Sequence, residues 1–170
     1  KKEKFKGNFL DFLEKVKENP EIVDSSHKKL YDTLTSYGVS TIEDSNPRKN
    51  KIFDGDNVKI YEYFKDEFFG AETVISKVMR FLKSASSRGE ESRQVLLLMG
   101  PVGAGKSALT EHIKKSLEGV SYFHINGDPQ KGNPLQLIPR GIREAFQEEL
   151  KVNIEGDISP PIRFQLLQDM

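Results

Sequence analysis

The chain has 170 residues and carries 26 basic and 26 acidic side chains, so its formal charge is zero. This balance argues against a dedicated nucleic-acid-binding or membrane-surface protein. The lack of cysteine excludes disulfides, thiolate zinc sites and thiol catalysis. The longest apolar run, residues 95–99, is too short to cross a bilayer, and no apolar signal-peptide core follows the amino terminus. We expect a soluble, cytoplasmic protein with no nucleic-acid or membrane partner.

The first forty residues carry two helical patterns. Apolar residues at helical spacing predict a first helix that ends at Asn19 and Pro20. A second helix is predicted from about residue 24, with Leu34 and Tyr37 on its apolar stripe and Gly38 as its C-terminal cap. Such stripes are typical of helix–helix packing. Residues 1–45 are therefore expected to form a small helical N-terminal segment.

Residues 39–57 are polar and rich in turn formers, which predicts a linker with one short turn or hairpin. Asp54, Asp56 and Asn57 resemble the start of a calcium loop, but its glycine and its terminal glutamate are not at the required positions. We therefore reject calcium binding here. An aromatic cluster then ends at Gly70, and a helix with one apolar face follows, its predicted apolar positions being Val74, Ile75, Val78, Phe81, Leu82 and Ala85.

The next elements alternate between strand and helix. The apolar run 95–99 predicts a strand buried on both faces, as in parallel sheets. A helix with Leu109, Ile113 and Leu117 on one face follows, with Gly119 as its cap, and residues 120–125 predict the next strand. This order is a βαβ unit, so the predicted fold class is α/β with a parallel sheet and flanking helices. A further helix is expected at 141–150, with Ile142, Ala145, Phe146 and Leu150 inward, and a short apolar helix after Pro160 and Pro161.

The turn between the first predicted strand and its helix matches the pattern G-x-x-x-x-G-K-[ST]. Glycines allow positive φ angles and a close approach to a polyphosphate, and successive amide N–H groups form an anion nest. The helix that begins near Lys106 directs the positive end of its dipole at the same place. The pattern predicts a P-loop nucleotide site made of Gly100, Pro101, Val102, Gly103, Ala104, Gly105, Lys106, Ser107 and Ala108.

Two side chains of this loop carry predicted chemistry. Lys106 would reach the β- and γ-phosphates as a compact cation, so it is the predicted catalytic residue. Ser107 would give its hydroxyl to Mg²⁺, so it is the predicted metal ligand. The guanine-specific pattern Asn-Lys-x-Asp is absent from the sequence, which favours adenine. The expected cofactors are ATP and Mg²⁺.

A second acidic site is not evident after Ser107. No acidic residue there follows a run of four apolar residues, the usual sign of a strand that ends in a magnesium-holding acid. Asp128, after the second predicted strand, has two open readings, a nucleotide-facing carboxylate or an ordinary turn residue. His27, His112 and His124 show no metal-ligand spacing and are read as solvated or packed residues. The sequence thus predicts nucleotide binding and leaves hydrolysis open.

The sequence segments on either side of the P-loop narrow the choice of protein family. The run 63–86 resembles the opening of an AAA+ module, and the fuller resemblance is to the AAA-like ATP-binding domain of bacterial PrkA-type serine protein kinases. It covers roughly residues 45 to 140, and it is carried by residues 46–48, 52–53, 68–72, 100–107, 126–127 and 133–135. The resemblance implies a nucleotide-binding domain over residues 46–170, with Phe69 and Gly70 contacting the adenine.

The same resemblance implies the activity. A protein of this family would be an ATP-dependent serine/threonine protein kinase whose kinase-like part follows this domain, so we expect these residues to be a segment of a longer, truncated chain. Its partners would be a nucleotide and a protein substrate or a neighbouring subunit. The alternative is a nucleotide-regulated interaction or assembly module, or another AAA+ remodelling ATPase, without kinase activity.

Overall fold

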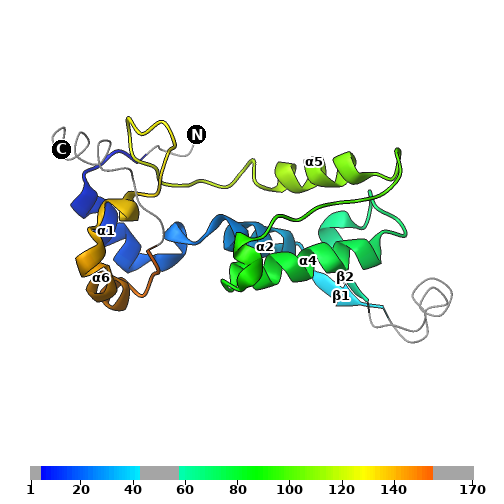
Figure 1. Ribbon diagram of the computed structural model, residues 1–170, viewed down its shortest axis with the longest axis horizontal. Coiled ribbons are helices and arrows are strands. Elements are labelled where there is room, and N and C mark those ends of the chain that lie inside the picture. Colours follow the sequence, from blue (N-terminus) through cyan, green and yellow to red (C-terminus); the bar gives the residue numbers. More distant parts are fainter. Residues whose placement is uncertain (1–4, 43–57, 155–170) are drawn as a thin grey trace. The chain divides into compact units, whose positions relative to one another are not determined.

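The computed structural model describes residues 5–42 and 58–154 (Figure 1). Its contacts divide the chain into two compact units. The central unit comprises residues 25–120, and the terminal unit comprises residues 1–24 and 121–170. These units are defined by contacts within the structure and do not test the expected domain boundary near residue 45, which stays a prediction.

The central unit opens with helix α2, Ser26–Ser36. The Ser25 hydroxyl caps its start by accepting a hydrogen bond from the Lys28 amide. Gly38 follows its end with a φ of +115°, a value that favours glycine and turns the chain into strand β1, Val39–Thr41. Strand β2, Lys59–Tyr61, pairs with β1 in antiparallel register, with Val39 opposite Tyr61. Most of the predicted linker with its short turn or hairpin, residues 43–57, lies outside the described residues.

Two further helices complete the central unit. After the 3₁₀ turn η2, Glu62–Phe64, come helix α4, Glu72–Ser86, the 3₁₀ turn η3, Glu90–Arg93, and helix α5, Lys106–Ser116. Helix α2 packs against α4, as Figure 1 shows. Residues from α2, β2, η2, α4 and α5 share one apolar core, whose buried members are Leu34, Tyr61, Phe64, Ile75, Val78, Met79, Leu82 and Leu109.

The two predicted parallel strands are not formed in the described part of the chain. The sheet found there has two strands, β1 and β2, and they are antiparallel. Residues 95–99 run as an extended coil (Figure 1), with Val95, Leu97 and Met99 largely exposed. A strand needs neighbours to pair its backbone groups, so an apolar run alone does not create one. The same holds for residues 120–125, and the parallel sheet stays a prediction.

The terminal unit is built around helix α1, Phe9–Glu18. A capping box starts it, because Asn8 and Asp11 each accept a hydrogen bond from the other's backbone amide. The unit continues with the 3₁₀ turns η1, Pro20–Val23, η4, Pro134–Leu137, and η5, Arg140–Ile142, and with helix α6, Arg143–Leu150. Its core is formed by Phe12, Val16, Leu135, Ile138, Leu150 and Ile154.

The helices predicted within the described residues are all found there, but some of their faces differ. Val74, expected on the apolar face of α4, is half exposed, and so is Ile142 before α6. Ala145 is also exposed. Leu117 rather than Gly119 caps α5. The predicted helix after Pro160 and Pro161 and the rejected calcium loop at 54–57 lie outside the described residues. No helix in the described ranges is long and apolar enough to span a membrane.

Candidate functional site

The loop 100–105 has the backbone that its glycines allow. Gly103 has a φ of +83° and Gly105 a φ of +75°, the left-handed region that other residues rarely adopt. The Ala104 amide donates to the Pro101 carbonyl at 3.3 Å and closes a tight turn, which leaves Val102 fully exposed at its tip. Gly105 is the N-terminal cap of α5. The loop thus joins an extended segment to a helix with its glycines at the sharpest bends.

Lys106, the first residue of α5, folds its side chain back over this loop. Its ammonium group donates to the carbonyl oxygens of Gly100 at 2.8 Å and Pro101 at 2.6 Å. These two bonds tie the beginning of the loop to the beginning of the helix. An ammonium group has three donors, so one remains for an anion. Lys106 is therefore fixed as a local positive charge beside the loop.

The next residues present the start of α5 to solvent. Ser107 and Ala108 are exposed, while Leu109 is buried in the central core and anchors the helix. The free amide groups of a first helical turn carry partial positive charge, and Lys106 adds a full one. A hydroxyl at Ser107 can accept a metal ion or donate to an anion. This end of α5 can therefore receive a polyanion.

Phe69 and Gly70 precede α4 in the same unit. The Phe69 ring is 78% exposed, which is unusual for so large an apolar side chain in a segment that otherwise supplies the core. Gly70 has a φ of +78°, and no atom lies within 4 Å of the place where a Cβ would stand. The exposed ring and the open glycine leave a flat apolar surface free for stacking. Contact with a base stays a prediction.

A pair of residues that the sequence did not indicate joins η2 to α5. Tyr63 and His112 exchange two hydrogen bonds, with the Tyr63 hydroxyl donating to the His112 carbonyl at 2.8 Å and the His112 Nε2 lying 3.1 Å from the Tyr63 carbonyl. We expected His112 to be either solvated or packed, and with its side chain only 11% exposed it is packed. The sign of this in the sequence is that His112 lies three residues after Leu109, on the same side of the helix.

Asp128, in the terminal unit, uses both carboxylate oxygens within its own loop. Oδ1 accepts from the Gln130 amide at 3.1 Å, and Oδ2 accepts from the Gly132 amide at 2.5 Å. The residue is 7% exposed. These bonds favour the turn reading of Asp128 over the nucleotide-facing one.

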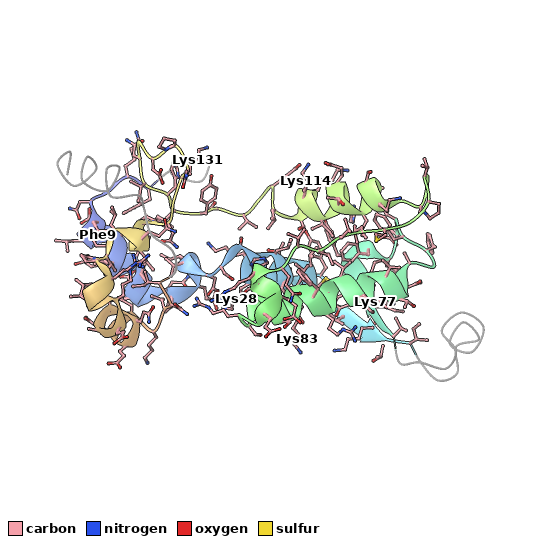
Figure 2. All side chains as sticks on the ribbon, in the orientation of Figure 1. Phe9, Lys28, Lys77, Lys83, Lys114 and Lys131 are labelled. Carbon is pink, nitrogen blue, oxygen red and sulfur yellow. The ribbon has the colours of Figure 1, made fainter. Side chains whose placement is uncertain are left out.

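The charged groups on α5 divide between its two ends. Lys114, labelled in Figure 2, forms an ion pair with Glu111 at 2.7 Å near the C-terminal end, where cations favour the helix dipole. Lys106 is at the other end, against the dipole, which is where a bound anion would compensate it. Among the described residues, no three histidines or acids come together as a metal site. The site is thus cationic, made of backbone amides, one lysine and one hydroxyl.

A glycine loop, a lysine hydrogen-bonded across it and a helix that begins at this lysine agree with the P-loop sequence pattern, and the family of nucleotide-binding domains that the whole chain matches is an AAA family. The family model for the PrkA AAA domain matches residues 7–170. The chain belongs to this family.

Two curated relatives agree with this assignment. ATP-dependent protease PrkA of Bacillus subtilis (strain 168) is 34% identical over 164 residues, which are 92% of this chain and 24% of that protein. Serine/threonine kinase YeaG of Escherichia coli (strain K12) is 34% identical over 85 residues, 50% of this chain and 13% of that protein. The chain therefore spans a quarter or less of the length of these relatives. No solved structure matches it.

Proposed function

We propose that this chain is the ATP-binding domain of a serine/threonine protein kinase, and that it binds ATP with Mg²⁺ at residues 100–108. The observation that carries the proposal is the Lys106 side chain, hydrogen-bonded to two loop carbonyls at the head of α5. A cation held there, beside the amides of a loop with positive-φ glycines, suits a chain of phosphates.

Each residue has a definite role in this proposal. The amides around Gly103 and Gly105 receive phosphate oxygens, and Lys106 neutralises the β- and γ-phosphates. The Ser107 hydroxyl, exposed at the first turn, would hold Mg²⁺, which would offset the negative charge of the phosphates. The Phe69 ring would stack on the adenine beside Gly70. The domain would extend over residues 46–170, with residues 1–45 as a helical N-terminal segment.

The kinase part of the proposal rests on the name of the Escherichia coli relatives and on the PrkA-type sequence resemblance. In that reaction the γ-phosphoryl group leaves ADP and bonds to the hydroxyl oxygen of a protein serine or threonine, which loses its proton. The acceptor would be a cytoplasmic protein. The name of the Bacillus relative favours a second candidate, an ATP-driven AAA machine or assembly module without kinase activity.

Titration with a fluorescent ATP analogue and Mg²⁺ tests the site. Lys106→Ala removes a charge-assisted contact of about 1.5–3 kcal/mol, so we expect affinity to fall by about ten- to a hundredfold. Lys115→Ala, an exposed lysine at the far end of the same helix, is the matched control and should bind like the parent. Equal affinity of the Lys106 variant and the parent would contradict the P-loop assignment.

A second assay separates the two candidate functions. Radiolabelled ATP incubated with the full-length protein and casein or the protein itself should yield labelled phosphoserine or phosphothreonine if the chain serves a kinase. Steady release of free phosphate without labelled protein favours the AAA machine. Tight binding with neither product favours the assembly module. Lys106→Ala should abolish whichever product is seen.

A further inference from the structure

The reciprocal contact between Tyr63 and His112 links two parts of the chain that are far apart in sequence. Each residue bonds to the other's backbone carbonyl, at 2.8 Å from the Tyr63 hydroxyl and 3.1 Å from the His112 ring, across a separation of 49 positions. The two rings also pack against each other at a tilt of 41°, with centroids 4.5 Å apart. Two directional bonds and a ring contact fix both distance and angle, which apolar packing alone does not.

The surroundings of the pair favour a rigid joint. The His112 ring also lies against Phe64 and Phe68, with centroids 5.7 Å and 5.4 Å away. Its Nδ1 lies 2.8 Å from a carboxylate oxygen of Glu67, although not in hydrogen-bonding geometry. Burial is the main cause that raises the pKa of Tyr63, with smaller contributions from Tyr37, Glu67 and Glu118. The hydroxyl therefore keeps its proton and its role as a donor at neutral pH.

The position of the pair gives it a functional meaning. His112 is in α5, whose first residue is Lys106, so the pair holds the helix that carries the phosphate site. Tyr63 is in η2, and the chain continues from it through Phe68, which packs on the same core, to Phe69 and Gly70. The joint therefore connects the segment proposed to contact the base with the helix proposed to contact the phosphates.

We propose that Tyr63 and His112 are positioning residues that set the spacing between the base-contacting segment and the phosphate-binding helix, and thereby select a nucleoside triphosphate over a bare polyphosphate. The inference rests on the proposed function and adds a specificity determinant to it. Neither residue touches the ligand. Weakening the contact between Tyr63 and His112 leaves the loop and Lys106 intact, so the phosphate contacts persist. The base-contacting segment is then no longer held at the right distance from them.

The test compares ATP with inorganic tripolyphosphate, both with Mg²⁺, on the full-length protein. Tyr63→Phe removes one hydroxyl and keeps the ring, and His112→Phe removes the ring nitrogens and keeps an aromatic side chain. For each variant we expect ATP to bind about two- to tenfold more weakly, the effect of one lost hydrogen bond, and tripolyphosphate to bind within about twofold of the parent. Tyr122→Phe, the same change at an exposed residue of the terminal unit, should alter neither affinity.

The outcomes separate the two proposals. If the parent binds neither ligand, the proposed function fails and the positioning role fails with it. If the parent binds both and each variant weakens both by the same factor, the pair only supports stability and the positioning role is wrong. Unchanged affinities in both variants also overturn it. Circular dichroism melting of each variant identifies any that does not fold, and Tyr63→Phe, the smallest change, is then decisive alone.

Discussion

The conformation of the loop 100–105 depends on the absence of a side chain at Gly103 and at Gly105. Both have positive φ angles, and no atom lies within 4 Å of either expected Cβ position. A methyl group there would meet no obstacle, so its cost is purely conformational. The loop owes its shape to the freedom of the backbone and not to a lack of room. A substitution of either glycine by alanine therefore tests the backbone conformation without adding a steric clash.

Gly105→Ala should lower the free energy of unfolding by about 1–2 kcal/mol, because alanine must adopt a left-handed conformation at the helix cap. Tripolyphosphate should bind more weakly for the same reason, since relaxing the strain moves the amides. Gly119→Ala is the control, because its Cβ is also free of neighbours and its φ is not positive. Chemical denaturation and calorimetric titration measure the two effects. Equal stability of the two variants would show that the φ of Gly105 is not required.

Loops in this protein are organised by side chains as well as by glycines. The segment 125–132 is held by Asp128, which accepts two backbone amides, and by the amide of Ile125, which donates to the Gly132 carbonyl at 3.2 Å. A Cβ on Gly132 would lie 2.8 Å from Asp128 Oδ2 and 2.7 Å from Gln136 Oε1. Asp128 therefore acts as the centre of a compact loop in the terminal unit.

Asp128→Asn replaces one acceptor oxygen by a donor and leaves a buried amide without its partner. We expect the free energy of unfolding to fall by about 1–3 kcal/mol and the Mg²⁺-dependent affinity for ATP to stay within about twofold. Asp66→Asn, at an exposed position, should change neither. A tenfold loss of ATP affinity that appears only with Mg²⁺ would instead restore the nucleotide-facing reading of Asp128.

On the scale of the whole molecule, the segment 95–99 contrasts with the well-packed helices. Leu98 packs against the central core, whereas Val95, Leu97 and Met99 are 91%, 74% and 85% exposed. Leu96 is exposed as well, at 42%, so Leu98 is the residue of this run that packs on the core. The exposed apolar side chains, which form the outer face of the segment, are what a neighbouring strand and a covering layer would bury. We therefore retain the proposed parallel sheet, with 95–99 as one of its strands.

Leu97→Glu tests this sheet in the full-length protein. If the outer face is buried, the variant should lose about 2–3 kcal/mol of stability, because a large apolar contact disappears and a charge is left in an apolar setting. Gln94→Glu, an exposed neighbour, is the control for added charge. Thermal melting compares the two variants. A Leu97 variant as stable as the control would rule out a buried strand here.

Local patterns predicted the helices, because caps and apolar spacing act within a few residues, as at Asn8 and Ser25. The glycine loop was predictable for the same reason. The strand at 95–99 was not confirmed, since a strand depends on partners elsewhere. The contact between Tyr63 and His112 was also beyond local patterns, because 49 positions separate the residues and only the packing of α5 brings them together.

The hydrogen bonds of Lys106 to Gly100 and Pro101 also bear on how fast a nucleotide arrives and leaves. The ammonium group is already directed over the loop, so a phosphate need not wait for a rearrangement before it makes contact. Association is then governed by diffusion and by attraction to this one cation. Variants that preserve the two bonds should therefore differ in residence time, whereas loss of the cation should also slow capture.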